Sequence, residues 1–171
     1  LYRAVGLKLV YNGKDPQDEA AALKAAQSIE LQDLQNPRLR QEHVGRAASI
    51  VSAMPPVRAA LLDFQRKIAA DAKGAVLDGR DIGTVVCPDA DFKFFITAKV
   101  ETRAKRRHRE LSGQGIEVVY DSVLEDLKER DERDSQRSTA PLKPAADAVH
   151  LDTSSLDADE VFAKVMGIIS G

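Results

Sequence analysis

Hydrophobic residues in the first seventy positions recur every three or four residues, which is the spacing of helices with one buried face. Residues 1–10 form the first predicted helix, which ends at the turn Asn12-Gly13. The pair Asp15-Pro16 is typical of a helix start, because a carboxylate caps free N–H groups and proline suits the first helical position. This second helix is expected to reach about residue 29, and residues 30–40 are predicted to be loop.

Two more helices are predicted before the pattern changes. Residues 41–53 form a short one, which Met54-Pro55-Pro56 stops. The next begins at Pro56, and one apolar stripe marks its inner face: Val57, Leu61, Phe64 and Ile68.

The second half of the chain alternates short apolar runs with helical patterns. Strands are predicted at residues 74–77, 92–97 and 148–151, and helices at 100–111, at 118–134 and from Asp157 onward. Strands separated by helices imply a parallel sheet with crossover helices, so the fold class is α/β. Three strands are few for such a core, and one or two more are expected ahead of Leu1.

Composition narrows the class of protein. With 171 residues and 43% hydrophobic content, the chain can form one compact unit or a core with small appendages. A net charge of -2 argues against a general nucleic-acid binder. The single cysteine, Cys87, excludes an intramolecular disulfide and fits a reducing cytosol, so a cytoplasmic location is expected. No apolar run approaches the roughly 20 residues of a membrane helix.

Two charged segments are candidates for ligand binding. DGRDIGTV, residues 78–85, follows the apolar run at 74–77, so Arg80 and Asp81 are expected at the carboxyl end of a strand, where ligands of open parallel sheets bind. ERDERDSQR, residues 129–137, is predicted to be helical. Its i, i+4, i+7 spacing gives one shared face to Arg130, Asp134 and Arg137. Such an array of guanidinium and carboxylate groups suits a phosphate or a sugar hydroxyl.

Simpler interpretations stay open for each segment. DGRDIG is also compatible with a surface turn, and ERDERDSQR with a solvated helix that carries i,i+4 ion pairs. Residues 99–109 hold six basic residues against one acid, so they form either a solvated helix or a surface that contacts RNA. Within them Arg103, Arg106 and Arg107 are predicted to point one way, and such a cluster is unfavourable unless anions approach it. The three histidines show no metal-site spacing, and no GxxxxGK[ST] loop is present.

Four segments taken in order closely resemble the bacterial cytidylate kinases, which are nucleoside monophosphate kinases. They are AASIVSAMPPVRAALLDFQR (47–66), VLDGRDIGTVVCPDADFKFFITA (76–98), RAKRRHREL (103–111) and LKERDERDSQRSTAPLKPAADAVHLDT (127–153). The resemblance covers nearly the whole chain. It implies a P-loop kinase core with a parallel sheet and flanking helices, an inserted domain that binds the nucleoside monophosphate, and a small lid.

The resemblance also implies domain boundaries. The core would comprise residues 1–10, 60–107 and 138–171, the insert 11–59, and the lid with its adjoining helix 108–137. The family's Gly-rich phosphate loop, with its lysine and the Ser or Thr on Mg²⁺, precedes the LYR segment, so the P-loop strand is absent from this chain and is expected upstream of Leu1. The insert is expected to be small and mostly helical.

The implied activity is transfer of the γ-phosphate of ATP to CMP or dCMP with Mg²⁺, by a monomer that binds neither nucleic acid nor membrane. Site roles carried over from the family place Arg3 on the CMP phosphate, and Arg80 is expected to bind phosphate. They place Ser49, Arg58 and Asp81 on the cytosine, Arg130 and Asp134 on the ribose, and Arg137 near the base and phosphate. Arg103, Arg106 and Arg107 match the basic lid helix that faces the ATP phosphates; with Arg80 they are the predicted catalytic residues. Arg40 is assigned to the monophosphate domain, and no residue is assigned to the metal.

Two alternatives remain. The first is a non-catalytic nucleic-acid-binding module that uses residues 99–109, for which binding should weaken steeply with salt. The second is a kinase for another small acceptor such as shikimate. The ERDERD helix and the Ser49/Arg58 pair favour a nucleotide instead.

Overall fold

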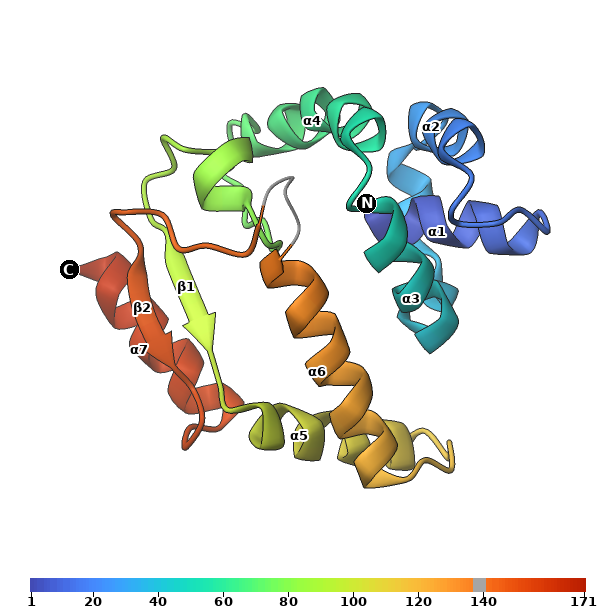
Figure 1. The fold of residues 1–171 in the computed structure, drawn as a ribbon. Helices are drawn as coiled ribbons and strands as arrows, with labels where there is room; N and C mark the ends of the chain where they lie inside the picture. Colours follow the sequence, from blue (N-terminus) through green and yellow to red (C-terminus); the bar gives the residue numbers. More distant parts are fainter. Residues whose placement is uncertain (137–140) are drawn as a thin grey trace. The chain divides into compact units, whose positions relative to one another are not determined.

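The structure is a computed structural model that describes residues 1–136 and 141–171, and it divides into two compact units (Figure 1). The first unit contains Leu1–Arg80, and the second contains Asp81–Gln136 and Leu142–Gly171. None of the helices in these described ranges is both long and apolar enough to cross a membrane.

The first unit is helical. Its helices are α1 (Tyr2–Tyr11), α2 (Glu19–Gln27), α3 (Glu42–Val51) and α4 (Pro55–Ala69), and two 3₁₀ turns, Leu31–Gln35 and Pro37–Arg40, join α2 to α3. All four helices contribute to one core, which includes Val5, Ala22, Val51 and Leu61. Helix α1 approaches α3 so closely that a Cβ on Gly6 would lie 3.0 Å from the Cβ of Ala47. Gly6 therefore allows the two helices to pack.

The predicted helices of this unit are confirmed, with one shifted start. Helix α2 begins at Glu19, and its N-cap is Asp18, whose carboxylate accepts a hydrogen bond from the backbone N–H of Ala21 at 3.0 Å. Asp15, the predicted start, instead accepts from the N–H of Gln17 at 2.9 Å. A local turn of this kind competes with helix initiation, so the helix starts one turn later than predicted.

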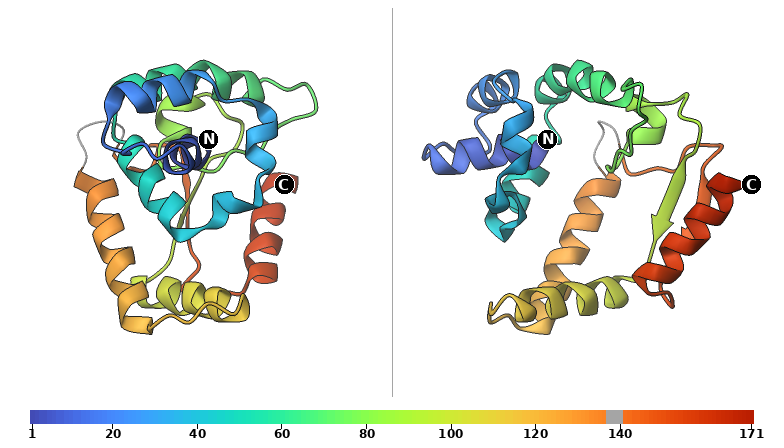
Figure 2. Two further views of the ribbon diagram at one scale, coloured as in Figure 1. Left: turned by 90° about the vertical axis from the view of Figure 1, so that its right-hand side faces the viewer. Right: turned by 180° about the vertical axis from the view of Figure 1, so that it is seen from behind.

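The second unit holds a small parallel sheet. Strand β1 (Phe94–Thr97) pairs in parallel with β2 (Val149–Asp152), with Phe94 opposite Val149 and Thr97 opposite Asp152. Helix α7 (Ala158–Ser170) follows β2 and runs alongside the two strands (Figures 1 and 2). Its predicted start is confirmed, because Asp157 and Glu160 form a reciprocal capping box.

The strand predicted at residues 74–77 is wrong. This segment has no regular structure, and Val76 is fully exposed. An extended apolar run becomes a strand only when a neighbouring strand accepts its hydrogen bonds, and in the described part of the chain β1 and β2 pair only with each other. The predicted three-stranded arrangement is therefore reduced to two strands, while the parallel α/β character is confirmed.

Helices α5 (Val100–Gly113) and α6 (Tyr120–Gln136) connect the two strands and pack against each other (Figure 2). Ala104 and Leu111 of α5 meet Val123 of α6 in a small core of their own. The predicted break after α5 is confirmed: Gly115 adopts a φ of 75°, a left-handed conformation that glycine tolerates best. This helical pair presents the basic segment and the ERDERD segment on adjoining helices.

Candidate functional site

Arg3 lies in the first turn of α1, and backbone carbonyl groups hold its side chain. Its Nη1 donates to the carbonyl oxygen of Leu39 at 2.7 Å and to that of Gln41 at 3.3 Å. A Cβ on Gly45 would lie 2.9 Å from Nη2, so the absence of a side chain at Gly45 leaves room for the guanidinium. The 3₁₀ turn that ends at Arg40 and the start of α3 thus fix the position of Arg3.

Ser49 carries a buried hydroxyl on α3. Among the residues that the structure describes, its Oγ has no hydrogen-bond partner. A buried hydroxyl without a partner is unfavourable by roughly 1–3 kcal/mol, and native proteins seldom leave one so. The Ser49 hydroxyl is therefore a candidate for contact with a polar group of a ligand.

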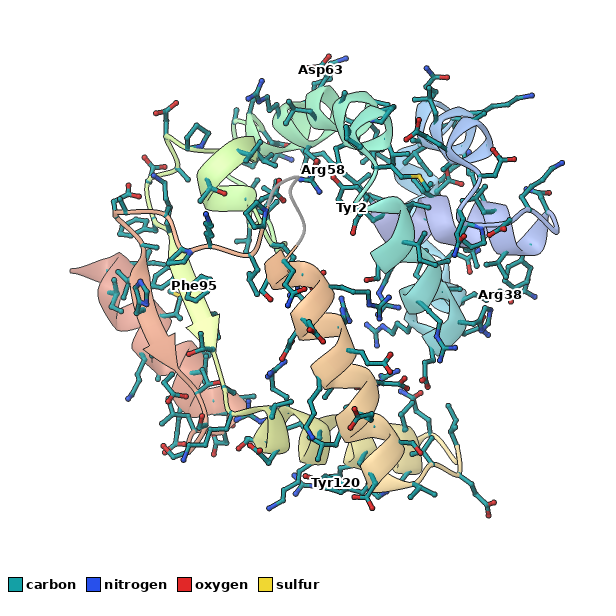
Figure 3. All side chains as sticks on the ribbon, viewed as in Figure 1. Tyr2, Arg38, Arg58, Asp63, Phe95 and Tyr120 are labelled. Atoms are coloured by element: carbon teal, nitrogen blue, oxygen red, sulfur yellow. The ribbon has the colours of Figure 1, made fainter. Side chains whose placement is uncertain are left out.

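Arg58 of α4 is linked to Ser49 through Ser52. The Nη1 of Arg58 donates to the carbonyl oxygen of Ser52 at 3.0 Å, and the Oγ of Ser52 donates to the carbonyl oxygen of Ser49 at 2.9 Å. The guanidinium of Arg58 also lies over the ring of Tyr2, 5.4 Å from its centroid (Figure 3). The structure thus links Arg58 to Ser49 through the hydrogen bonds of Ser52, and it adds Tyr2, to which the sequence analysis assigned no role.

Arg80 and Asp81 precede an unusual turn. Residues Ile82–Val86 form a single π-helical turn, in which the carbonyl oxygen of Ile82 accepts a hydrogen bond from the N–H of Cys87, five residues on, at 2.7 Å. Such turns are rare in proteins as a whole, and those that occur are frequently found at functional sites. Asp81 is 4% exposed and Arg80 is partly buried. Both residues were expected at the end of a strand, but they follow the irregular segment at 74–77 instead.

Arg130 and Asp134 share one face of α6, as predicted. The Nε of Arg130 lies 3.9 Å from Oδ2 of Asp134, and the Asp134 side chain is 7% exposed. Arg137, the third member of the predicted array, lies outside the described residues. A buried carboxylate beside a guanidinium is a suitable partner for a ligand hydroxyl.

The three arginines of α5 contact different parts of the second unit. Arg103 forms a two-pronged ion pair with Asp131 of α6, with distances of 2.9 Å from Nη1 to Oδ1 and 2.5 Å from Nη2 to Oδ2. Arg106 donates to the carbonyl oxygens of Thr153 at 2.5 Å and Leu156 at 2.8 Å.

Arg107 pairs with Glu110 on its own helix at 2.9 Å. The partners Asp131 and Thr153 were not predicted from the sequence. Asp131 lies inside the ERDERD segment, but helix spacing alone does not reveal a contact with a neighbouring helix.

Asp131 further favours the charged form of Arg103. Its hydrogen bonds to Asp131 raise the pKa of the guanidinium, against the opposing effect of partial burial. No group of three or more His, Cys, Asp or Glu residues in the described ranges could hold a metal ion. The described arginines and carboxylates therefore offer binding groups for anions and hydroxyls.

Known proteins that are similar in sequence show the family of this chain. A sequence profile described as cytidylate kinase matches residues 1–171. Cytidylate kinases from three bacteria are more than half identical over nearly all of the chain. That of Paramagnetospirillum magneticum is 56% identical over 99% of this chain and 82% of its own length; those of Xanthobacter autotrophicus and Methylocella silvestris are 54% and 53% identical over 99% of this chain, and over 81% and 78% of their own lengths.

The small parallel sheet with many helices is consistent with a P-loop kinase. The chain belongs to the cytidylate kinase family. The alternative of a nucleic-acid-binding module receives no support from these matches.

Proposed function

We propose that this protein is an ATP-dependent phosphotransferase that converts CMP or dCMP to CDP or dCDP. The family match over residues 1–171 supports this activity. The structural observation that carries the proposal is the buried hydroxyl of Ser49, which has no hydrogen-bond partner among the described residues. Ser52 links the same serine to Arg58. A hydroxyl and a guanidinium together suit a base that has both donors and acceptors.

In the first unit, Ser49 and Arg58 are proposed to contact the cytosine, and Arg3 the phosphate of CMP. Arg3 is suited to this role because two carbonyl oxygens orient its guanidinium, a planar group whose five N–H donors match the oxygens of an anion. Arg40 is proposed to contribute to the same monophosphate-binding part, for which we propose residues 11–59 as the inserted domain.

In the second unit, Asp81 is proposed to select cytosine. Its carboxylate would accept a hydrogen bond from the 4-amino group of cytosine, whereas uracil presents an oxygen at that position. Arg130 and Asp134 are proposed to hold the ribose, which the buried position of Asp134 favours. Arg137, outside the described residues, is proposed to complete the surroundings of base and phosphate.

Phosphoryl transfer requires little covalent chemistry from a protein. It requires that the two substrates be held in line and that negative charge on the moving group be neutralised. Arg80, Arg103 and Arg107 are proposed to supply this positive charge. Arg106 is also proposed to face the ATP phosphates. In addition, its three hydrogen bonds to Thr153 and Leu156 hold α5 against the segment that follows β2.

ATP would bring Mg²⁺, which neutralises phosphate charge in such reactions. The described residues contain no group of three or more His, Cys, Asp or Glu that could hold the ion, so we assign none of them to it. We further propose a lid at residues 108–137, a core at 1–10, 60–107 and 138–171, a monomeric state and a cytoplasmic location.

The test is a turnover assay on the full-length protein with ATP and Mg²⁺. We expect equimolar ADP and CDP from CMP, ADP and dCDP from dCMP, and much lower turnover of UMP and AMP. Absence of any CDP would overturn the proposal. A parallel titration with single-stranded RNA should show no appreciable affinity at any salt concentration, whereas a steeply salt-dependent affinity would favour the nucleic-acid-binding alternative.

A further inference from the structure

The two-pronged contact between Arg103 and Asp131 joins the helices that carry the second unit's candidate residues. Helix α5 carries Arg103, and α6 carries Asp131 between Arg130 and Asp134. Asp131 therefore faces α5, while its neighbours at positions 130 and 134 pair with each other along α6. One carboxylate links the basic helix to the helix proposed to hold the ribose.

The geometry of this contact fixes the guanidinium in more than one direction. Two parallel N–H···O bonds restrict rotation of the planar group, and the Nε of Arg103 donates to the carbonyl oxygen of Ala98 at 3.0 Å. The third bond ties the same side chain to the segment between β1 and α5. An arginine has five N–H donors, so these three contacts leave two for a ligand.

The pair is also only partly buried, with 34% of the Arg103 side chain and 37% of the Asp131 side chain exposed. Single-bond ion pairs of this exposure contribute little to folding, but a two-pronged pair can contribute more. Kinetics and unfolding therefore have to be measured on the same variants.

We propose that Asp131 is a positioning residue that holds Arg103 in the orientation needed to stabilise the phosphoryl group in transfer. This inference rests on the proposed function, because it takes Arg103 as a phosphate contact. It predicts that loss of the Asp131 carboxylate lowers kcat while the affinity for CMP changes little, since the misplaced group acts on the reacting phosphate.

The experiment compares Asp131→Asn, Asp131→Glu and Arg103→Gln with the double variant in the full-length protein. The matched control is Glu125→Gln, because Glu125 is an exposed acid on α6 whose ion pair is with Lys128 of the same helix. Steady-state kinetics with CMP and ATP give kcat and KM, and thermal unfolding of every variant measures folding independently.

Asp131→Asn is expected to lower kcat about 10- to 100-fold with a KM for CMP within about threefold of the unmutated value. Asp131→Glu should recover part of the loss because it restores the carboxylate, and Glu125→Gln should stay within about twofold of the unmutated enzyme. In the Arg103→Gln background, Asp131→Asn should cause no further loss, since the carboxylate acts through that arginine.

Multiplicative losses in the double variant would overturn the inference, as would an Asp131→Asn enzyme with unchanged kcat. A loss of kcat matched by an equal loss in Glu125→Gln, or explained by unfolding at the assay temperature in both Asp131 variants, would also overturn it. If the unmutated protein forms no CDP, the proposed function itself fails; if it does form CDP and the variants behave as the control, only the role of Asp131 fails.

Discussion

Ser52 donates a hydrogen bond from its Oγ to the carbonyl oxygen of Ser49 at 2.9 Å, while the Oγ of Ser49 has no partner among the described residues. Two serines three positions apart on the same stretch of chain thus have opposite roles. The hydroxyl of Ser52 forms a hydrogen bond within the protein, whereas that of Ser49 is proposed to bind the ligand. Substitution of each serine should therefore affect a different property, ligand binding for Ser49 and stability for Ser52.

Ser49→Ala should leave the free energy of unfolding nearly unchanged or raise it, because the variant removes a buried group that forms no hydrogen bond within the described protein. The same variant should weaken CMP binding about 5- to 10-fold, because the loss of one hydrogen bond costs roughly 1 kcal/mol of binding free energy. Urea unfolding and calorimetric titration with CMP measure the two effects separately.

Ser52→Ala is the matched control. It should lower the free energy of unfolding by about 1 kcal/mol through the lost bond to Ser49 and affect CMP binding less than Ser49→Ala does. If Ser49→Ala destabilised the protein and left CMP binding intact, the assignment of Ser49 to the ligand would be wrong.

Tyr2 supports Arg58 through its ring. A cation–π contact of this kind is worth about 0.5–1 kcal/mol at a partly exposed position. Tyr2→Leu should therefore raise the KM for CMP about two- to fivefold, whereas Tyr2→Phe should stay close to the unmutated value because the ring remains. Steady-state kinetics at saturating ATP provides the measurement, and equal effects of both variants would argue against the ring contact.

Asp33 makes the first unit sensitive to acid. Hydrogen bonds from the Lys8 ammonium and from the backbone N–H of Glu30 hold the pKa of Asp33 below its ordinary value. The unfolded chain therefore binds this proton more readily than the folded chain. The stabilisation is complete above the ordinary carboxyl pKa of about 4 and is lost as the pH falls through the lowered value.

Asp33→Asn should accordingly lower the urea midpoint near neutral pH, by less than about 1 kcal/mol in free energy because the pair is partly exposed. The difference from the unmutated protein should shrink as the pH falls below the ordinary carboxyl pKa of about 4 and on through the lowered value. Asp63→Asn, which removes an exposed carboxylate from α4, is the control for the change in net charge. A destabilisation that is independent of pH would contradict this interpretation.

Asp157 caps α7, a helix that has no buried residue. Local interactions therefore contribute a large share of its stability. Asp157→Ala should lower the free energy of unfolding by about 1 kcal/mol and speed hydrogen exchange in the first turn of α7. Asp159→Ala, which removes an acid from the same turn without removing the cap, should have a smaller effect. Equal exchange rates in both variants would argue against the capping box.

The helices could be predicted because their ends are marked locally. Prolines and cap residues define where α4 and α7 begin, and Gly115 marks the end of α5. The segment at 74–77 could not be predicted correctly, because its apolar composition does not tell whether a neighbouring strand is present. The π-helical turn after Asp81 could not be predicted either, because neither a cap residue nor a hydrophobic period distinguishes Ile82–Val86 from an ordinary turn.

In the candidate site, too, local features could be predicted and contacts between elements could not. The shared face of Arg130 and Asp134 follows from helix periodicity, and the structure confirms it. The partners of Arg103 and Arg106 could not be found in this way, because Asp131 and Thr153 lie on other elements far along the chain. Contacts of that kind depend on how elements pack, which periodicity does not describe.

The most direct measurement is the ratio of kcat/KM for CMP to that for UMP, in the unmutated full-length protein and in Asp81→Ala. We predict a strong preference for CMP in the unmutated protein and a ratio lowered about 5- to 150-fold in the variant, because an acceptor matched to the cytosine amino group is worth about 1–3 kcal/mol. Equal use of CMP and UMP by the unmutated protein would contradict the proposed selection of cytosine.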